Sequence, residues 1–273
     1  MSAAPEFAQP ASLPPTSEDY HALTIRSVHW WSPTLFSLVL DRPESFRFIS
    51  GQFARLGLPV EGEWVWRAYS ICSSVFDEHL EFLSIVVPNG PFTQALKHVQ
   101  AGDTLYVDKR NFGTLTTDRF RGQKDLWMLA TGTGIAPFLS ILRDPGVWRA
   151  FERIVVVHSV RTAAELAPAG ELAGFARDPS SAPGPATLRY LPVVTREPGA
   201  TALASRIPDL LDDGRLEAAA GATIDVAHAR VMTCGNPALA QAMRQRLTAR
   251  GFRPTRRHAP GQMSFENYWT SRS

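Results

Sequence analysis

A glycine-rich turn that directly follows a short apolar segment is the feature that most constrains this chain. Residues 126–130 read Leu-Trp-Met-Leu-Ala, the turn Thr131–Gly134 follows, and an apolar stretch then continues to Leu142. A strand, a tight turn and a helix in this order predict one unit of a parallel α/β sheet. Backbone N–H groups at such a turn can approach a pyrophosphate at the start of the helix. The usual third glycine is replaced by Pro137, so the spacing alone also fits a simple tight turn.

The second half of the chain continues this alternation of strands and helices. Apolar segments predict further strands at 154–158, 188–194 and 231–234, and helices at 135–142, 206–211 and 237–249. The alternation predicts a doubly wound parallel sheet with helices on both faces. Segment 167–186 is rich in Ala, Pro, Gly and Ser; we interpret it as a loop or a poorly packed helix and assign it no role.

The first half contains short β-rich segments separated by turn residues. These are 23–31, 35–40, 52–58, 66–70, 80–87 and 104–107, and a single short helix is expected at 92–99. Such spacing predicts an antiparallel barrel or sandwich. We therefore expect a proline-rich disordered tail at 1–19, a β-barrel domain at 20–122 and an α/β domain at 123–273.

Composition and charge exclude several classes of protein. The formal net charge of +2 is too small for wholesale nucleic-acid binding. Residues 1–122 contain 10 basic and 13 acidic side chains, whereas residues 123–273 contain 18 and 13, so the second half is favoured for an anionic ligand. Only two cysteines occur, far apart in the sequence, which excludes a four-cysteine iron–sulfur cluster within this chain and supports neither a zinc site nor a disulfide scaffold. No apolar run reaches the ~18 residues of a membrane span, and a secretion signal is not apparent, so we expect a cytoplasmic protein without membrane insertion.

A second motif, Arg67-Ala68-Tyr69-Ser70, closes an apolar run in the first half. Alternate side chains of an extended segment share a face, so Arg67 and Tyr69 lie together and Ser70 lies on the other face or at its edge. This set suits a flavin, because it offers a cation for the pyrophosphate, an aromatic ring to stack and a hydroxyl to reach the reactive nitrogen. A half-buried strand with a paired arginine is the alternative interpretation.

Arginines follow the predicted strands of the second half. The strand at 154–158 continues His158-Ser159-Val160-Arg161, where an NAD-binding fold would carry an acid for the ribose 2′-hydroxyl. Arg161 therefore favours a 2′-phosphate, and Arg196 and Arg206 are candidates to converge on the same group, since guanidinium groups bind phosphate oxygens in a bidentate fork. With 25 arginines in the chain, each of them is also compatible with a solvated surface residue.

Five ordered motifs give the chain a resemblance to bacterial ferredoxin-NADP reductases, also called flavodoxin reductases. The motifs are Arg67–Ser70, Val87–Thr93, Leu126–Gly134, Thr233–Pro237 and Phe265–Trp269, and the resemblance extends from about Leu23 to Trp269. It implies a β-barrel domain that binds FAD, followed by a doubly wound NADP-binding domain.

On the flavin side, the resemblance implies that Arg67 binds the FAD pyrophosphate, Tyr69 packs on the isoalloxazine and Ser70 lies near N5, with Ala68 completing the motif. Further implied contacts are backbone groups of Ile85 and Val86 at the ring edge, and Gly90, Phe92 and Thr93 at the FAD phosphates.

On the nucleotide side, the resemblance assigns Thr133 and Gly134 to the nicotinamide and pyrophosphate loop. It assigns Arg161, Arg196 and Arg206 to the 2′-phosphate. Cys234 would face the nicotinamide and Glu266 would assist proton movement. Tyr268 would cover the flavin face that the nicotinamide must occupy, and Trp269 would stack on the adenine. Thr270–Ser273 follow Trp269 in this sequence, whereas the resemblance implies a chain that ends at the tryptophan.

The implied activity is hydride transfer from NADPH to flavin N5, followed by single-electron transfer to ferredoxin or flavodoxin, carried out by a monomer. Six arginines between Arg244 and Arg257, with no acidic residue among them, form either a solvated helix face or a basic rim that steers such an acidic partner. Two alternatives remain. One is an NADH-dependent flavin reductase component of an oxygenase, which would prefer NADH. The other is a non-catalytic FAD-binding electron-transfer subunit, which would show no NADPH-dependent turnover.

Overall fold

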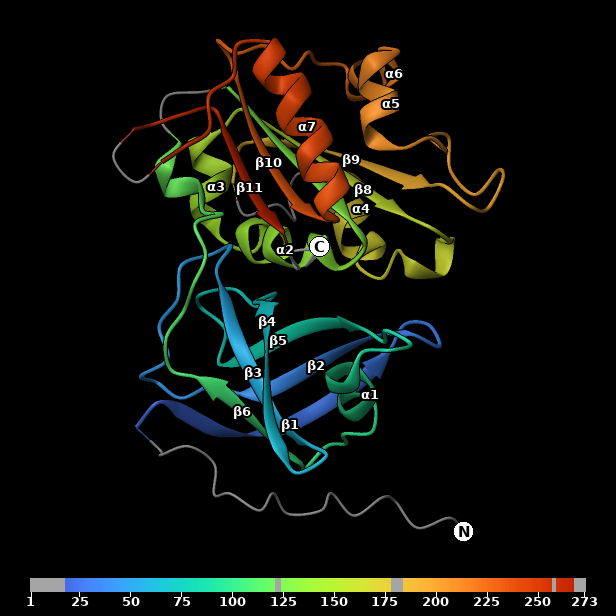
Figure 1. Cartoon of the computed structure of the whole chain (residues 1–273). Helices are drawn as coiled ribbons and strands as arrows, with labels where there is room; N and C mark the ends of the chain where they lie inside the picture. Colours follow the sequence, from blue (N-terminus) through green and yellow to red (C-terminus); the bar gives the residue numbers. More distant parts are fainter. Residues whose placement is uncertain (1–17, 121–123, 178–183, 257–258, 268–273) are drawn as a thin grey trace.

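The described part of the chain is built around one antiparallel and one parallel β-sheet (Figure 1). The computed structural model describes residues 18–120, 124–177, 184–256 and 259–267. The first sheet is antiparallel with the strand order β4-β3-β6-β1-β2-β5, and the second is parallel with the order β11-β10-β7-β8-β9. The sequence-based prediction of a β-rich antiparallel unit followed by a parallel α/β unit is confirmed.

The antiparallel sheet curls around one apolar core. Its strands are β1 (Tyr20–Trp30), β2 (Leu35–Asp41), β3 (Phe53–Val60), β4 (Glu63–Ser70), β5 (His79–Ile85) and β6 (Thr104–Asp108). Ile71, just beyond β4, forms a bridge with Phe82 of β5, so the two edges of the curled sheet meet at one end. The helix α1 (Pro91–Leu96) starts on a proline, which suits a first helical turn, and buries Phe92 and Leu96.

The parallel sheet separates two apolar cores. It consists of β7 (Asp125–Thr131), β8 (Arg153–Val160), β9 (Thr187–Val194), β10 (Ala229–Gly235) and β11 (Met263–Asn267). Successive side chains of a strand point to opposite faces, so Leu126 and Met128 belong to one core whereas Trp127 and Leu129 belong to the other. This explains why segment 126–130 is apolar at every position.

Helices cover both faces of this sheet, as the alternation predicts. The first core packs against α2 (Ala136–Leu142), α3 (Pro145–Ala150) and α4 (Ala169–Arg177), and the second against α5 (Ile207–Asp212), α6 (Arg215–Ala220) and α7 (Pro237–Ala249). In Figure 1, α2 lies at the junction between the parallel sheet and the antiparallel one.

Of the two structures that the sequence allows for segment 167–186, a loop or a poorly packed helix, the described part contains a helix. Residues Ala169–Arg177 form the helix α4, and Leu172 is fully buried in the first core. A nine-residue helix with one deeply buried leucine has little apolar periodicity, which is why the sequence did not distinguish it from a loop. The sequence assigned this segment no role, and the structure adds one contact, in which Arg143 donates to Glu171 of α4.

Candidate active site

The carboxyl ends of three neighbouring strands, β7, β10 and β11, meet at the side of the parallel sheet that faces the antiparallel sheet (Figure 1). In register, Cys234 of β10 lies between Ala130 of β7 and Glu266 of β11. The crevice beyond the carboxyl ends of parallel strands is where open α/β sheets bind ligands. Cys234 and Glu266 are therefore brought together at this edge from positions far apart in the sequence.

The glycine turn packs directly against the end of β10. A Cβ atom on Gly134 would lie 2.4 Å from the carbonyl oxygen of Cys234, and one on Gly235 would lie 2.3 Å from the hydroxyl of Thr131. Gly235 also has φ of +125°, which side-chain-bearing residues rarely adopt. The Thr131 hydroxyl accepts a hydrogen bond from the backbone N–H of Asn236 at 2.8 Å. Both glycines are thus required for the close approach of the two strand ends.

Replacing Gly134 by alanine is expected to destabilise the protein by about 1–3 kcal/mol, because the new methyl group would meet backbone atoms that can move only with β10. NADPH binding should weaken at the same time, and titration calorimetry together with denaturant unfolding would measure both effects. Gly174→Ala is the matched control, since nothing lies within 4 Å of its Cβ position in α4 and alanine favours a helix. A Gly134→Ala protein with normal stability and nucleotide affinity would contradict the close-approach argument.

A buried histidine forms a hydrogen bond with the same turn. The side chain of His158, in β8, is fully buried, and its Nε2 lies 2.9 Å from the carbonyl oxygen of Gly132. Burial lowers the pKa of His158 to about 4, so the imidazole is neutral and its Nε2 carries the proton that it donates to this carbonyl. Gly132 has φ of +54°. In the sequence, His158 is recognisable only as the end of a strand; its contact with Gly132 depends on its buried position in the fold.

The Arg67–Ser70 motif forms the end of β4. Ser70 is 3% exposed, and its hydroxyl has no hydrogen-bond partner within the described residues. The Tyr69 hydroxyl shares a hydrogen bond of 3.1 Å with Ser84 of β5, and burial raises the pKa of Tyr69 to about 12. Arg67 is exposed, as is Ala68. The strand therefore holds one aromatic ring in place and leaves a cation and a buried hydroxyl available to a ligand.

The segment between β5 and α1 is organised by one threonine. The Thr93 hydroxyl accepts a hydrogen bond from the backbone N–H of Val87 at 3.0 Å and lies 3.1 Å from the carbonyl oxygen of Gly90. A Cβ atom on Gly90 would lie 2.9 Å from this hydroxyl, so glycine is needed there.

The structure limits the parts that three other predicted flavin contacts can play. Phe92 is 2% exposed and belongs to the barrel core, so only its backbone is available to a phosphate. The backbone N–H of Val86 is engaged by the Thr34 carbonyl at 2.7 Å, while the side chains of Ile85 and Val86 are half-buried.

Two of the three predicted phosphate arginines are joined at the carboxyl ends of β8 and β9. The backbone N–H of Arg196 donates to the carbonyl of Arg161 at 2.8 Å. The Arg161 side chain is exposed and lies 3.4 Å from Glu165. Arg206 is the N-cap residue of α5, three residues after Leu203, which forms a bridge with Val193 of β9. All three residues are exposed; Arg161 and Arg196 follow the ends of β8 and β9, and Arg206 precedes α5.

Glu266 reaches across to the antiparallel unit. One carboxylate oxygen lies 2.8 Å from the position that a Cβ on Gly113 would take, and that position is 3.0 Å from the Phe53 ring. The other oxygen is buried without a hydrogen-bond partner within the described residues. Burial raises the pKa of Glu266 to about 7. This carboxyl group is consequently able to hold or release a proton near neutral pH.

The predicted ring-covering residue Tyr268 and the predicted adenine-stacking residue Trp269 lie outside the described residues. Their roles remain predictions.

The described residues fit a flavin and a nicotinamide dinucleotide. The buried Ser70 hydroxyl lacks a partner, as expected if a ligand atom completes its hydrogen bonding. The packing of Gly134 and Gly235 keeps the turn free of side chains at the strand edge where a pyrophosphate would approach. Fold and site together define a two-domain oxidoreductase that uses a flavin and a nicotinamide nucleotide.

Comparison with known proteins agrees with this class. Residues 23–111 match the family model of the oxidoreductase FAD-binding domain, and residues 128–245 match that of the oxidoreductase NAD-binding domain. Ferredoxin–NADP reductase A of Sorangium cellulosum is 42% identical over 257 residues, which cover 90% of this chain and 89% of that protein. Ferredoxin–NADP reductase of Azotobacter vinelandii is 42% identical over 225 residues, covering 79% and 84%.

A solved structure is also similar over nearly the whole chain. The crystal structure of a ferredoxin NADP⁺ reductase from Neisseria gonorrhoeae with bound FAD and NADP superposes with a TM-score of 0.86 at 35% identity, covering 93% of this chain and 100% of that one. The chain belongs to the ferredoxin–NADP reductase family.

Proposed function

We propose that this chain transfers electrons between NADPH and a ferredoxin or a flavodoxin, with FAD as its bound cofactor. Relatives at 42% identity are named ferredoxin–NADP reductases, and relatives at 36% are named flavodoxin/ferredoxin–NADP reductases. When bound, FAD supplies the exchange between a two-electron hydride donor and one-electron carriers. The observation that carries the proposal is the placement of Cys234 and Glu266 between the glycine turn and the antiparallel sheet.

We assign the binding of FAD to the end of β4 and the start of α1. Arg67 would bind the pyrophosphate and Tyr69 would pack on the ring, while Ser70 would donate its free hydroxyl to the ring. Backbone groups at the two adjacent segments would complete the site, at Ala68, Ile85, Val86, Gly90, Phe92 and Thr93.

We assign the nucleotide to the edge formed by the carboxyl ends of β7, β8, β9 and β10. Thr133 and Gly134 would hold the pyrophosphate, and Arg161, Arg196 and Arg206 the 2′-phosphate. Cys234 would limit the position of the nicotinamide, and Glu266 would hold or release a proton at its carboxylate oxygen. Tyr268 and Trp269 would cover the flavin ring and the adenine. The boundary between the two domains would fall near residue 122, between β6 and β7.

The arginines from Arg244 to Arg256, in the last part of α7 and just after it, offer a smaller docking surface than the sequence suggests. Arg246 pairs with Asp212, Arg250 pairs with Glu217, and Arg244 lies over the Phe265 ring. Within the described residues, only the exposed Arg253 and Arg256 of this segment lack a side-chain ion pair or ring contact. A steering role for an acidic partner would rest mainly on these two residues, and such steering should fall as salt increases.

Three further expectations are that the protein does not insert into a membrane, that it is cytoplasmic and that it is a monomer. No helix among the described residues is long and apolar enough to cross a membrane. Cys72 and Cys234 are buried and form no disulfide, as is usual in a reducing compartment such as the cytoplasm. Size-exclusion chromatography tests the expected monomer.

The function is tested with the purified, FAD-loaded protein. We expect it to reduce ferricyanide and a bacterial ferredoxin or flavodoxin with NADPH, and to do so much more slowly at limiting NADH. Preference for NADH would favour the flavin reductase component of an oxygenase. A yellow protein without NADPH-dependent turnover would favour the non-catalytic subunit.

A further inference from the structure

Three hydrogen bonds fasten the segment after β4 to the helix α2. Nη1 of Arg143 donates to the carbonyl of Cys72 at 2.9 Å, and the Ser140 hydroxyl donates to the carbonyl of Ser73 at 2.7 Å. The Ser74 hydroxyl donates to the carbonyl of Arg143 at 3.2 Å. Cys72, Ser73 and Ser140 are at most 1% exposed, so these contacts are shielded from competing water.

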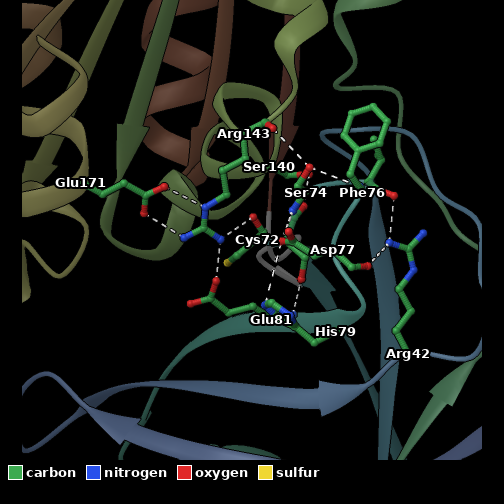
Figure 2. A network of polar contacts seen from close by, with 12 residues as sticks. Arg42, Cys72, Ser74, Phe76, Asp77, His79, Glu81, Ser140, Arg143 and Glu171 are labelled. Carbon is green, nitrogen blue, oxygen red and sulfur yellow. Dashed lines mark hydrogen bonds and ion pairs between the residues drawn. The ribbon is translucent and has the colours of Figure 1, made fainter. Parts of the chain in front are cut away.

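The Arg143 side chain adds an ion-pair network across the same junction (Figure 2). Its Nε and Nη2 bind the two carboxylate oxygens of Glu171 in α4, both at 2.8 Å. Its Nη1 binds Glu81 of β5 at 2.5 Å. The side chain of Arg143 is 22% exposed and that of Glu81 19%. One guanidinium therefore joins an acid of the antiparallel sheet to an acid of the parallel α/β unit.

The electrostatics keep this guanidinium charged. Burial by itself would lower the pKa of Arg143, but the hydrogen bonds and charges of Glu171 and Glu81 raise it above its usual range. A half-buried, bidentate arginine–carboxylate pair is stronger and more directional than an exposed ion pair. Removing one acid from such a group leaves the remaining charge poorly compensated.

The two segments that these contacts join, residues 72–74 and the helix α2, both start next to the proposed reaction centre. Residues 72–74 begin two positions after Ser70, whose unpartnered hydroxyl belongs to the flavin side. The helix α2 begins directly after the glycine turn. The end of β4 is therefore connected to the glycine turn through residues 72–74 and the helix α2. Arg143 lies at the end of α2 that is remote from the glycine turn.

We propose that Arg143 is a positioning residue that holds the glycine turn at a fixed distance and angle from the end of β4, and so sets how closely the nicotinamide approaches the flavin. This inference rests on the proposed function. Because a displacement of about 1 Å between reacting groups can cost about 100-fold in rate, loosening the junction should slow hydride transfer without removing any group that contacts the nucleotide.

The first test compares Arg143→Gln and Arg143→Lys with the wild-type, FAD-loaded protein. Arg143→Gln should lower kcat with NADPH and ferricyanide at least about tenfold, and slow the anaerobic reduction of the flavin by NADPH equally. The KM for NADPH should stay within about twofold, because the glycine turn and the phosphate arginines are intact. Arg143→Lys, which keeps the charge but not the fork, should recover part of the rate. Arg246→Gln, which breaks the ion pair to Asp212 inside the α/β unit, is the matched control and should retain wild-type kcat.

The second test compares the contributions of Glu81 and Glu171 to kcat. Glu81→Gln and Glu171→Gln each remove one charge from the same guanidinium, but only Glu81 lies in the antiparallel sheet. Glu81→Gln should reduce kcat severalfold more than Glu171→Gln. These milder variants also decide the matter if Arg143→Gln fails to fold.

A third readout does not depend on turnover. Amide hydrogen exchange at residues 72–74 should accelerate in Arg143→Gln and Glu81→Gln more than in Arg246→Gln, since the contacts that protect this segment would open more often. Unchanged kcat, a parallel rise in KM, or equal effects of the two acid variants would each overturn the inference. Absence of NADPH-dependent turnover in the wild-type protein would instead overturn the proposed function.

Discussion

Arg161→Ala is expected to raise the KM for NADPH by about ten- to a hundred-fold and to leave the KM for NADH within about twofold. The exposed guanidinium follows β8 at the nucleotide edge and is joined through the backbone to Arg196. A lost charge-assisted hydrogen bond to the 2′-phosphate costs about 1.5–3 kcal/mol, and NADH lacks that phosphate. Steady-state kinetics with both nucleotides would measure the ratio.

Arg153→Ala is the matched control for this experiment. Arg153 lies at the opposite end of the same strand, where it pairs with Asp125 and donates to the carbonyl of Gly221. Its replacement should leave the preference for NADPH over NADH unchanged. If Arg161→Ala affected both nucleotides equally, Arg161 would not bind the 2′-phosphate.

Glu266→Gln is expected to remove a pH-dependent loss of stability of up to about 3 kcal/mol. Burial raises the pKa of Glu266 from 4.5 to about 7 in the folded protein. The folded state therefore favours the protonated carboxyl. Its contribution is fully present below pH 4.5 and is lost as the pH rises through about 7, at about 1.4 kcal/mol for each pH unit.

The measurement is urea unfolding of Glu266→Gln and of the wild type between pH 4.5 and 8.5. The stability of the variant relative to the wild type should increase across the lower part of this range and become constant above about pH 8. Glu44→Gln, at an exposed position, provides the control for loss of a surface carboxylate. A constant difference between Glu266→Gln and the wild type would mean that this carboxyl is ionised throughout.

The same carboxyl group bears on turnover. With a pKa of about 7, Glu266 changes protonation within the physiological range, which suits a group that exchanges protons with a reaction centre. We expect the pH profile of kcat to lose one ionisation near neutral pH in Glu266→Gln. A profile identical to that of the wild type would remove Glu266 from the proton path.

The sequence by itself was sufficient for the architecture. The uninterrupted apolar segment 126–130 predicted a strand buried on both faces, and the structure places its alternate residues in two cores. In the turn that follows, Gly132 has a local reason to be glycine, because its φ is positive, whereas Gly134 must be glycine because the end of β10, distant in the sequence, packs against it. For α4 the sequence left a loop or a poorly packed helix open, because the packing of Leu172 in the tertiary structure, rather than apolar periodicity, stabilises that helix.

Only the tertiary structure determined the contacts between residues that are distant in the sequence. The Arg143 guanidinium meets Glu81 and the Cys72 carbonyl across 62 and 71 positions, and Glu266 approaches Gly113 only once both sheets are in place. Short sequence patterns encode the periodicity of helices and strands and the residues that turns require. The sequence therefore determined two domains, a glycine turn and a set of arginines near strand ends. Burial and desolvation depend on everything that surrounds a group, so the fold alone determined that Glu266 has a raised pKa and that Arg143 joins the two halves of the molecule.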